Sequence, residues 1–186
     1  MLNVALQEFI QEGYGGASLS RIVKAARISK TTLYSRYKSK EELFRAIMTQ
    51  QVERLSVIRT LTASPAFNLA EGLKAYANRT LAISLEGDLL AVNRLIYSEA
   101  HRFPELGLAA AERTQVGIAQ IAWFIEQCNH PERTVLAEPR DNAEAFILLL
   151  RGWYVNAMLS SREVTADERE QWVGRMVPVF IAGCRG

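Results

Sequence analysis

Between residues 29 and 40 the chain is dense in side chains that form hydrogen bonds or carry positive charge. These are Ser29, Lys30, Thr31, Thr32, Tyr34, Ser35, Arg36, Lys38 and Lys40. Hydroxyl and cationic groups of this kind contact base edges and phosphate oxygens when a helix enters the major groove of DNA. Two of them have simpler interpretations, because Tyr34 could be a packed surface aromatic and Lys40 a solvated lysine at a helix start.

The positive charge of the chain is concentrated in the same region. Eight of the 22 basic residues but only two of the 20 acidic residues lie between Ser18 and Arg45, so this stretch carries +6 and the remainder −4. A short basic module on a mildly acidic body indicates that one end of the protein meets a polyanion. A solvated charged face would give the same count, and the charge alone does not separate the two interpretations.

The spacing of apolar residues predicts the elements that would position these groups. A first helix should end at Gly13, a second should run from Ser18 to Ala26, and a third from Lys30 to Tyr37. Two short helices joined by about three residues, behind a stabilising first helix, form a tri-helical helix-turn-helix unit that binds DNA. The third helix would turn Leu33 and Tyr37 inward and its polar residues outward.

Helical spacing continues to the end of the chain, so the expected fold is all-α with about nine helices. A long fourth helix opens at Ser39, which has capping-box spacing to Glu42. Residues 129–139 are expected to form a loop. The eighth helix, expected from about Asp141 to Ser160, is apolar nearly all round and should be buried on more than one side. Thr165 should cap the last helix, which Pro178 should kink or end.

Few other residues could do chemistry. The histidines His101 and His130 and the cysteines Cys128 and Cys184 lack metal-ligand spacing. We find no acid–base pair, nucleophile arrangement or cofactor loop, so we predict no catalytic residues, metal or cofactor. A helical enzyme is the rival interpretation, which turnover of a ligand would reveal. The chain has no apolar run long enough to span a membrane and no signal peptide, which indicates a cytoplasmic protein with reduced cysteines.

The stretch from Ala25 to Leu43, AARISKTTLYSRYKSKEEL, resembles the signature of the TetR family. The resemblance covers about Leu2 to Ile47 and is specific, because Thr-Leu-Tyr stands at a fixed distance from Ser-Lys-Glu-Glu-Leu. A weaker similarity, from Arg94 to Leu106, is to the AefR-type C-terminal domain of the same family. Together they imply a DNA-binding domain in residues 1–45 and a ligand-binding and dimerisation domain in residues 46–186.

The resemblance also implies roles for individual residues. Thr31, Thr32 and Tyr34 occupy positions of the recognition helix that meet bases or backbone, and Lys40 occupies a phosphate-binding position. The implied DNA contacts are Ser18, Ser20, Arg27, Ser29, Lys30, Thr31, Thr32, Tyr34, Ser35, Arg36, Lys38 and Lys40.

Three departures from the family pattern bear on DNA binding. Arg27 stands where glycine is usual, and if its backbone is left-handed it costs on the order of 1 kcal/mol, which a phosphate contact could offset. Thr31 replaces another common glycine, which should change base preference. The chain begins almost at its first helix, where many relatives carry a basic arm, so we expect either weaker binding or a trimmed sequence.

The remaining implications concern sensing. Two copies should pair through the last two helices, about Asp141–Ser160 and Asp167–Phe180, and bind a near-palindromic operator. They should release it when a small molecule binds between the fourth helix and the seventh, which is expected from about Glu105 to Cys128. The candidate pocket residues, which could equally fill a core or pair internally, are Phe67, Tyr76, Asn93, Arg94, Tyr97, Trp123 and Trp153. The alternative function is a dimeric sensor of the same fold that does not bind DNA.

Overall fold

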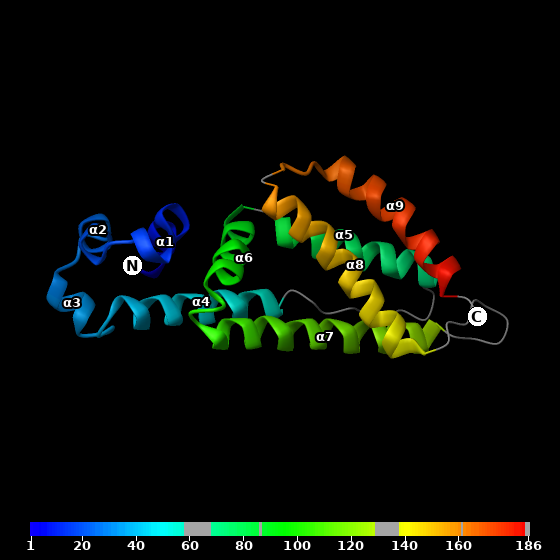
Figure 1. The fold of residues 1–186 in the computed structure, drawn as a ribbon, viewed down its shortest axis with the longest axis horizontal. Helices are drawn as coiled ribbons and strands as arrows, with labels where there is room; N and C mark the ends of the chain where they lie inside the picture. The colour runs from blue at the N-terminus through cyan, green and yellow to red at the C-terminus, as the bar shows by residue number, and fades with distance from the viewer. Residues whose placement is uncertain (58–67, 86, 129–137, 161, 185–186) are drawn as a thin grey trace. The chain divides into compact units, whose positions relative to one another are not determined.

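The computed structural model describes residues 1–57, 68–85, 87–128, 138–160 and 162–184. The regular structure of these residues is helical (Figure 1). The helices are α1 (Leu2–Gly16), α2 (Leu19–Ala25), α3 (Lys30–Tyr34), α4 (Lys40–Val57), α5 (Leu69–Leu85), α6 (Gly87–Glu99), α7 (Pro104–Cys128), α8 (Pro139–Leu159) and α9 (Ala166–Gly183). The expected all-α class with about nine helices is confirmed. No helix in this described part is both long and apolar enough to cross a membrane.

The chain packs as two compact units that are interleaved in sequence. The first unit comprises residues 1–58 and 87–110, and the second comprises residues 59–86 and 111–186. Helix α7 therefore begins in the first unit and continues in the second. The expected division between residues 45 and 46 separates a DNA-binding domain from a ligand-binding and dimerisation domain. The two units are defined by packing and do not test that division, which stays a prediction.

The core of the first unit is built on aromatic rings. Phe9 of α1, Phe44 of α4 and Phe103, which precedes α7, are fully buried, and Tyr14 packs among them. The Tyr14 ring lies edge-on to the Phe44 and Phe103 rings, each with centroids 5.0 Å away. Gly13, with φ of 66°, breaks α1 where the helix was expected to end. The chain resumes helical geometry and reaches Gly16, which places Tyr14 after the break.

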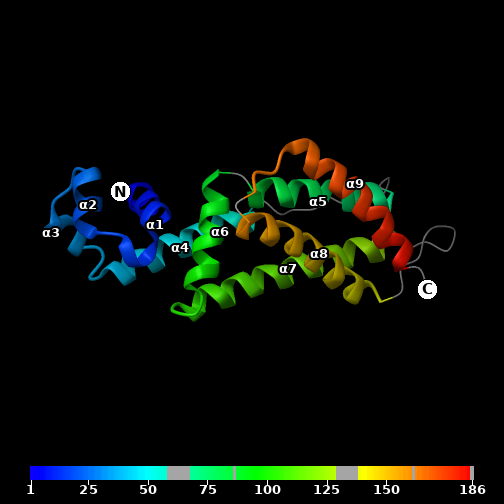
Figure 2. The same ribbon diagram turned by 45° about the horizontal axis from the view of Figure 1, so that its top comes forward.

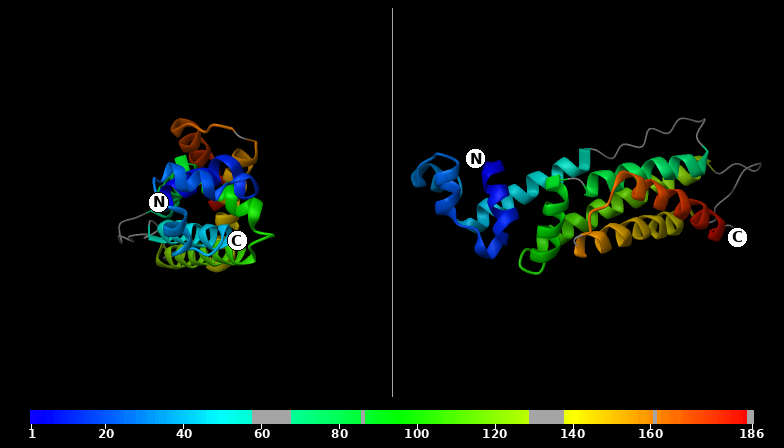
Figure 3. Two further views of the ribbon diagram at one scale, coloured as in Figure 1. Left: turned by 90° about the vertical axis from the view of Figure 1, so that its left-hand side faces the viewer. Right: turned by 90° about the horizontal axis from the view of Figure 1, so that it is seen from above.

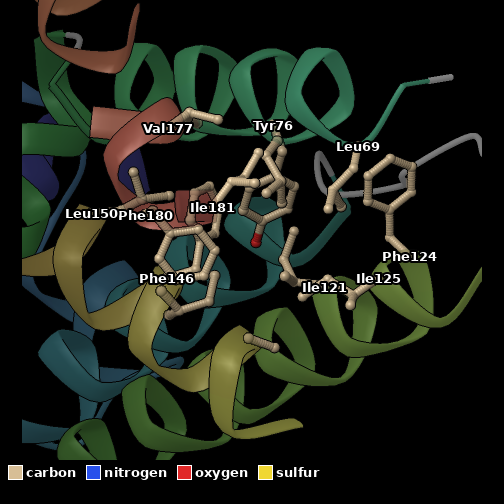
Figure 4. Close-up of a cluster of buried hydrophobic side chains, with 14 of the residues drawn as sticks. Leu69, Tyr76, Ile121, Phe124, Ile125, Phe146, Leu150, Val177, Phe180 and Ile181 are labelled. Carbon is tan, nitrogen blue, oxygen red and sulfur yellow. The ribbon is translucent and has the colours of Figure 1, made fainter. Parts of the chain in front are cut away.

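The second unit is formed by α5, α8, α9 and the later part of α7. Helix α5 packs along α9 and against α8 (Figures 1 and 2). Phe146 of α8 is fully buried in the core, and its ring meets that of Phe180, with centroids 5.2 Å apart (Figure 4). Gly72 of α5 leaves room for Phe124 of α7, because a Cβ atom there would lie 2.0 Å from the Phe124 ring.

Two prolines lie within helices, and one of them was expected in a loop. Pro139 was expected in a loop but occupies the first turn of α8, where its missing N–H is not needed. Pro178 was expected to kink or end α9. The helix does not end there but continues to Gly183, and a kink at Pro178 stays a prediction. Proline has no N–H, so Pro178 cannot donate the usual helical hydrogen bond to the carbonyl of Gly174. Both residues are exposed, so water can donate to that carbonyl instead. The capping box predicted from Thr165 to Glu168 is present.

Candidate nucleic-acid interface

Helices α2 and α3 are two short elements that follow α1 and precede the long α4 (Figure 3). The turn between them contains a left-handed residue, Arg27, with φ of 53°. The N–H of Ile28 donates to the carbonyl of Val23 over 3.2 Å and closes the end of α2. Glycine usually fills a left-handed position after a helix. Because the backbone of Arg27 is left-handed, arginine at this position is expected to lower the stability of the fold by about 1 kcal/mol relative to glycine.

Ser29 opens α3. Its hydroxyl accepts a hydrogen bond from the N–H of Thr32 over 2.9 Å and lies 2.8 Å from the Thr32 hydroxyl. The Ser35 hydroxyl donates to the Thr32 carbonyl over 2.9 Å. The helix ends at Tyr34 rather than at the expected Tyr37, so it has only five residues. Because so short a helix is marginal alone, these caps and its buried anchor have to stabilise it.

That anchor is Leu33, which is 1% exposed in the core of the first unit. Tyr37 packs against the same core, so both residues predicted to point inward do so. Tyr34 is 48% exposed, so it is not the packed aromatic of the alternative interpretation. The predicted contact residues of this segment are all exposed: Lys30, Thr31, Thr32, Tyr34, Ser35 and Arg36. Their individual DNA contacts stay predictions.

Apart from Lys40, the basic residues around α3 fall into two groups. Arg21 pairs with Glu8 at 2.7 Å and with Glu12 at 3.3 Å, and Arg45 pairs with Glu41 at 2.8 Å. The second group consists of exposed residues that form no ion pair within the described part of the chain. Its members are Lys24, Arg27, Lys30, Arg36 and Lys38. The charge that can meet phosphates is therefore smaller than the sequence count, and it lies on α3 and on the segments before and after it in the sequence.

Glu8 holds the start of α2, a role that the sequence did not reveal. Its Oε1 atom accepts from Arg21 Nε over 2.7 Å and from the backbone N–H of Ser18 over 2.8 Å. The hydrogen bond from Arg21, together with that of Ser18, lowers the pKa of the Glu8 carboxyl against the opposing effect of burial. Ser18 is half-buried and Ser20 is exposed, and a phosphate contact by either stays a prediction.

Lys40 makes internal contacts that were not expected for a phosphate-binding residue. Its Nζ donates to the carbonyl of Ala17 over 2.9 Å and to that of Gly15 over 3.1 Å. The same atom lies 4.8 Å from the centre of the Tyr14 ring. Lys40 therefore links the first turn of α4 by hydrogen bonds to the end of α1 and to Ala17, which follows it. Whether it also holds a phosphate stays a prediction.

The candidate pocket residues are divided between the two units. Asn93, Arg94 and Tyr97 lie on α6 in the first unit, and only Asn93 of these is buried. Phe67 lies outside the described residues. Tyr76, Trp123 and Trp153 belong to the second unit.

These three second-unit aromatics differ in their surroundings. Tyr76 is buried on α5 and its ring lies toward Phe146 (Figure 4). Trp153 stacks on Trp172, with centroids 4.7 Å apart, and Trp123 is 46% exposed. Ligand contact by any of the candidate pocket residues stays a prediction.

No group of three or more potential metal ligands occurs in the described ranges. His101 is exposed at the α6–α7 corner, and His130 lies outside the described residues. Cys184 is a free thiol, and burial raises its pKa.

Two models of known protein families match the chain. The first, described as bacterial regulatory proteins of the tetR family, matches residues 1–47. The second, described as the C-terminal domain of AefR-like transcriptional repressors, matches residues 71–183, more than half of the chain. The chain belongs to the TetR family. TetR-family proteins are DNA-binding transcriptional regulators and not enzymes, so the expected class of function is confirmed.

Individual TetR-family relatives are similar over different lengths. The transcriptional regulator UidR of Escherichia coli K-12 is 43% identical over 54 residues, which cover 29% of this chain and 28% of that protein. A TetR-family regulator from Mesorhizobium loti has a solved structure with a TM-score of 0.78 and 28% identity, covering 98% of this chain and 93% of that one. The flavonoid-responsive regulator FrrA gives a TM-score of 0.70 and 28% identity, covering 99% and 94%. The chain thus matches under a third of UidR but nearly all of the two solved structures.

Proposed function

We propose that the protein is a dimeric repressor that binds a near-palindromic operator and is released by a small molecule. The observation that carries the proposal is α3 itself, which is capped by Ser29, anchored by Leu33 and flanked in the sequence by exposed cations. A major groove admits one such helix, and its polar side chains can read base edges. The match to a repressor family over residues 71–183 supports repression rather than activation.

Exposed apolar side chains on the last two helices support pairing of two copies. Leu148, Leu149 and Leu159 of α8 are 49%, 46% and 73% exposed, and Val179 of α9 is 73% exposed. Large apolar side chains that stay exposed on a monomer are candidates for burial in a subunit interface. A two-fold dimer through α8 and α9 would present two copies of α3 to successive turns of DNA.

Buried polar atoms in the second unit support a polar effector. Asn78 Oδ1 on α5 and Gln120 Oε1 on α7 are buried and have no hydrogen-bond partner in the part of the chain that the structure describes. A buried acceptor without a donor is costly, so a bound molecule that donates hydrogen bonds would be favoured there. Gln120 lies one helical turn before Phe124, which packs over Gly72 of α5. FrrA, at 28% identity, is a flavonoid-responsive regulator, and flavonoids carry hydroxyl donors.

The DNA half of the proposal is tested by selecting duplexes from a random library with the full-length protein. We expect selected sequences with near-palindromic half-sites about one helical turn apart, bound by a dimer in sedimentation analysis. Selected sequences without symmetry, or binding by a monomer, would contradict the dimeric operator. Failure to select any duplex would favour the sensor that does not bind DNA.

The effector half is tested by thermal unfolding with two matched probes, the hydroxylated flavone apigenin and unsubstituted flavone. We expect only the hydroxylated compound to raise the unfolding temperature and to displace the selected duplex, because only it donates hydrogen bonds. Gln120→Leu should abolish that difference between the two compounds. Equal shifts with both compounds would contradict recognition by the buried acceptors.

A further inference from the structure

The connection between α6 and α7, residues 100–103, lies outside the helix-turn-helix motif but contacts its supporting residues within the first unit. The guanidinium carbon of Arg102 lies 4.4 Å from the centre of the Tyr14 ring. The adjacent Phe103 is fully buried against the rings of Tyr14 and Phe44. Helix α4 also contacts this connection, because the guanidinium carbon of Arg45 lies 5.1 Å from the centre of the Phe103 ring.

The contacts continue from Tyr14 to the start of α2. Lys40 Nζ lies against the same Tyr14 ring and donates to the carbonyls of Gly15 and Ala17. Ala17 immediately precedes Ser18, the N-cap of α2. The ring of Tyr14 therefore has one cation from the α6–α7 connection and one from α4, and the second of these holds the segment from which α2 begins.

We propose that Arg102 is a positioning residue for DNA reading. It acts through Tyr14 and Lys40 on the start of α2, and it thereby fixes the orientation of α3 against the rest of the first unit. The ring of Tyr14 attracts cations through its electron-rich face, an interaction typically equivalent to a two- to fivefold change in an equilibrium constant at a partly exposed site. Because α2 and α3 are short, a shift at their supporting segment changes how α3 meets base edges. A general phosphate contact would instead weaken binding to every sequence.

The test compares Arg102→Gln with the wild-type protein on a duplex selected by the wild type and on a scrambled duplex of equal length. We expect Arg102→Gln to weaken binding to the selected duplex two- to fivefold, with the scrambled duplex and the salt slope unchanged. Arg102→Lys keeps the cation and should restore affinity to within twofold of the wild type. The matched controls are His101→Gln, an exposed neighbour, and Arg79→Gln, which removes the same charge from an exposed site in the second unit.

A double-mutant cycle identifies the path of the effect. Tyr14→Phe keeps the ring and should bind as the wild type, whereas Tyr14→Leu removes it and should make Arg102→Gln silent. Additive effects of Tyr14→Leu and Arg102→Gln would overturn the proposal. It would also be overturned by equal losses on both duplexes with a salt slope reduced by about 1, which mark a phosphate contact. Lower thermal stability with unchanged affinity, measured on protein of known active fraction, would overturn it in favour of a purely structural role.

Discussion

Lys40 Nζ lies 4.8 Å from the centre of the Tyr14 ring while it donates hydrogen bonds to the carbonyls of Gly15 and Ala17. The lysine at the start of α4 thus contributes to the structure of the DNA-binding region even in the absence of DNA. A phosphate contact at the same ammonium would add to these bonds or replace one of them. The two roles make different experimental predictions.

Lys40→Ala should lower the free energy of unfolding by about 1–2 kcal/mol, because two hydrogen bonds from a charged donor are lost. If Lys40 also holds a phosphate, the variant should reduce the slope of log affinity against log salt by about 1. Urea unfolding and titrations at several salt concentrations measure the two effects separately. Lys38→Ala, at an exposed neighbour, is the control for stability. An unchanged free energy of unfolding in Lys40→Ala would contradict the structural role.

Arg27→Gly should raise the free energy of unfolding by about 1 kcal/mol relative to Arg27→Ala, because only glycine adopts a φ of 53° without a steric cost. Both variants remove the same charge, so they should lose equal affinity for DNA if Arg27 reaches a phosphate. Chemical denaturation and DNA titration of the two variants provide the comparison. If the alanine and glycine variants were equally stable, Arg27 would not be strained.

Gly72→Ala should destabilise the protein by about 1–3 kcal/mol, since its Cβ would lie 2.0 Å from the Phe124 ring and force it to move. Phe124→Leu in the same chain should recover part of that loss by making room. Gly107→Ala is the control, because the nearest atom to its Cβ is 3.7 Å away and alanine favours a helix. Thermal unfolding of the three variants would contradict the packing if Gly72→Ala were as stable as Gly107→Ala.

Acid should weaken the first unit partly through Glu8. The hydrogen bond from Arg21 lowers the pKa of the Glu8 carboxyl in the folded protein. A depressed folded pKa contributes stability that is present above the unfolded pKa and is lost as the pH falls through the folded value. Because this pair is partly exposed, we expect the contribution to stay below about 1 kcal/mol. Glu8→Gln should therefore have a lower free energy of unfolding than the wild type at neutral pH, and that free energy should fall less steeply as the pH is lowered. An equally steep fall in the variant and the wild type would contradict the role of Glu8.

The sequence predicted the helical class and the inward positions of α3, because these follow from local apolar spacing. Leu33 and Tyr37 were placed correctly for this reason, and the caps at Ser29 and Thr165 follow from short-range hydrogen bonding. The length of α3 and the start of α8 were wrong by a few residues, since helix ends depend on which cap competes best.

Contacts between distant residues could not be predicted in the same way. Arg21 counted toward the basic surface in the sequence, yet it pairs with Glu8, which lies 13 positions earlier on another helix. Arg102 meets Tyr14 across 88 positions, a pairing that leaves no local pattern. A cation is available to DNA only if no carboxylate folds against it, and that depends on tertiary structure.

Reading of DNA sequence by α3 can be tested at its exposed aromatic residue with the variant Tyr34→Ala. Fluorescence anisotropy should compare the variant and the wild type on a duplex selected by the wild type and on a scrambled duplex of the same length. The 48% exposed ring is not part of the core, so the variant should fold normally. We predict a loss of at least about tenfold on the selected duplex, equivalent to about 1.4 kcal/mol of base discrimination, and less than twofold on the scrambled duplex. Equal losses on the two duplexes, or no loss on either, would contradict the claim.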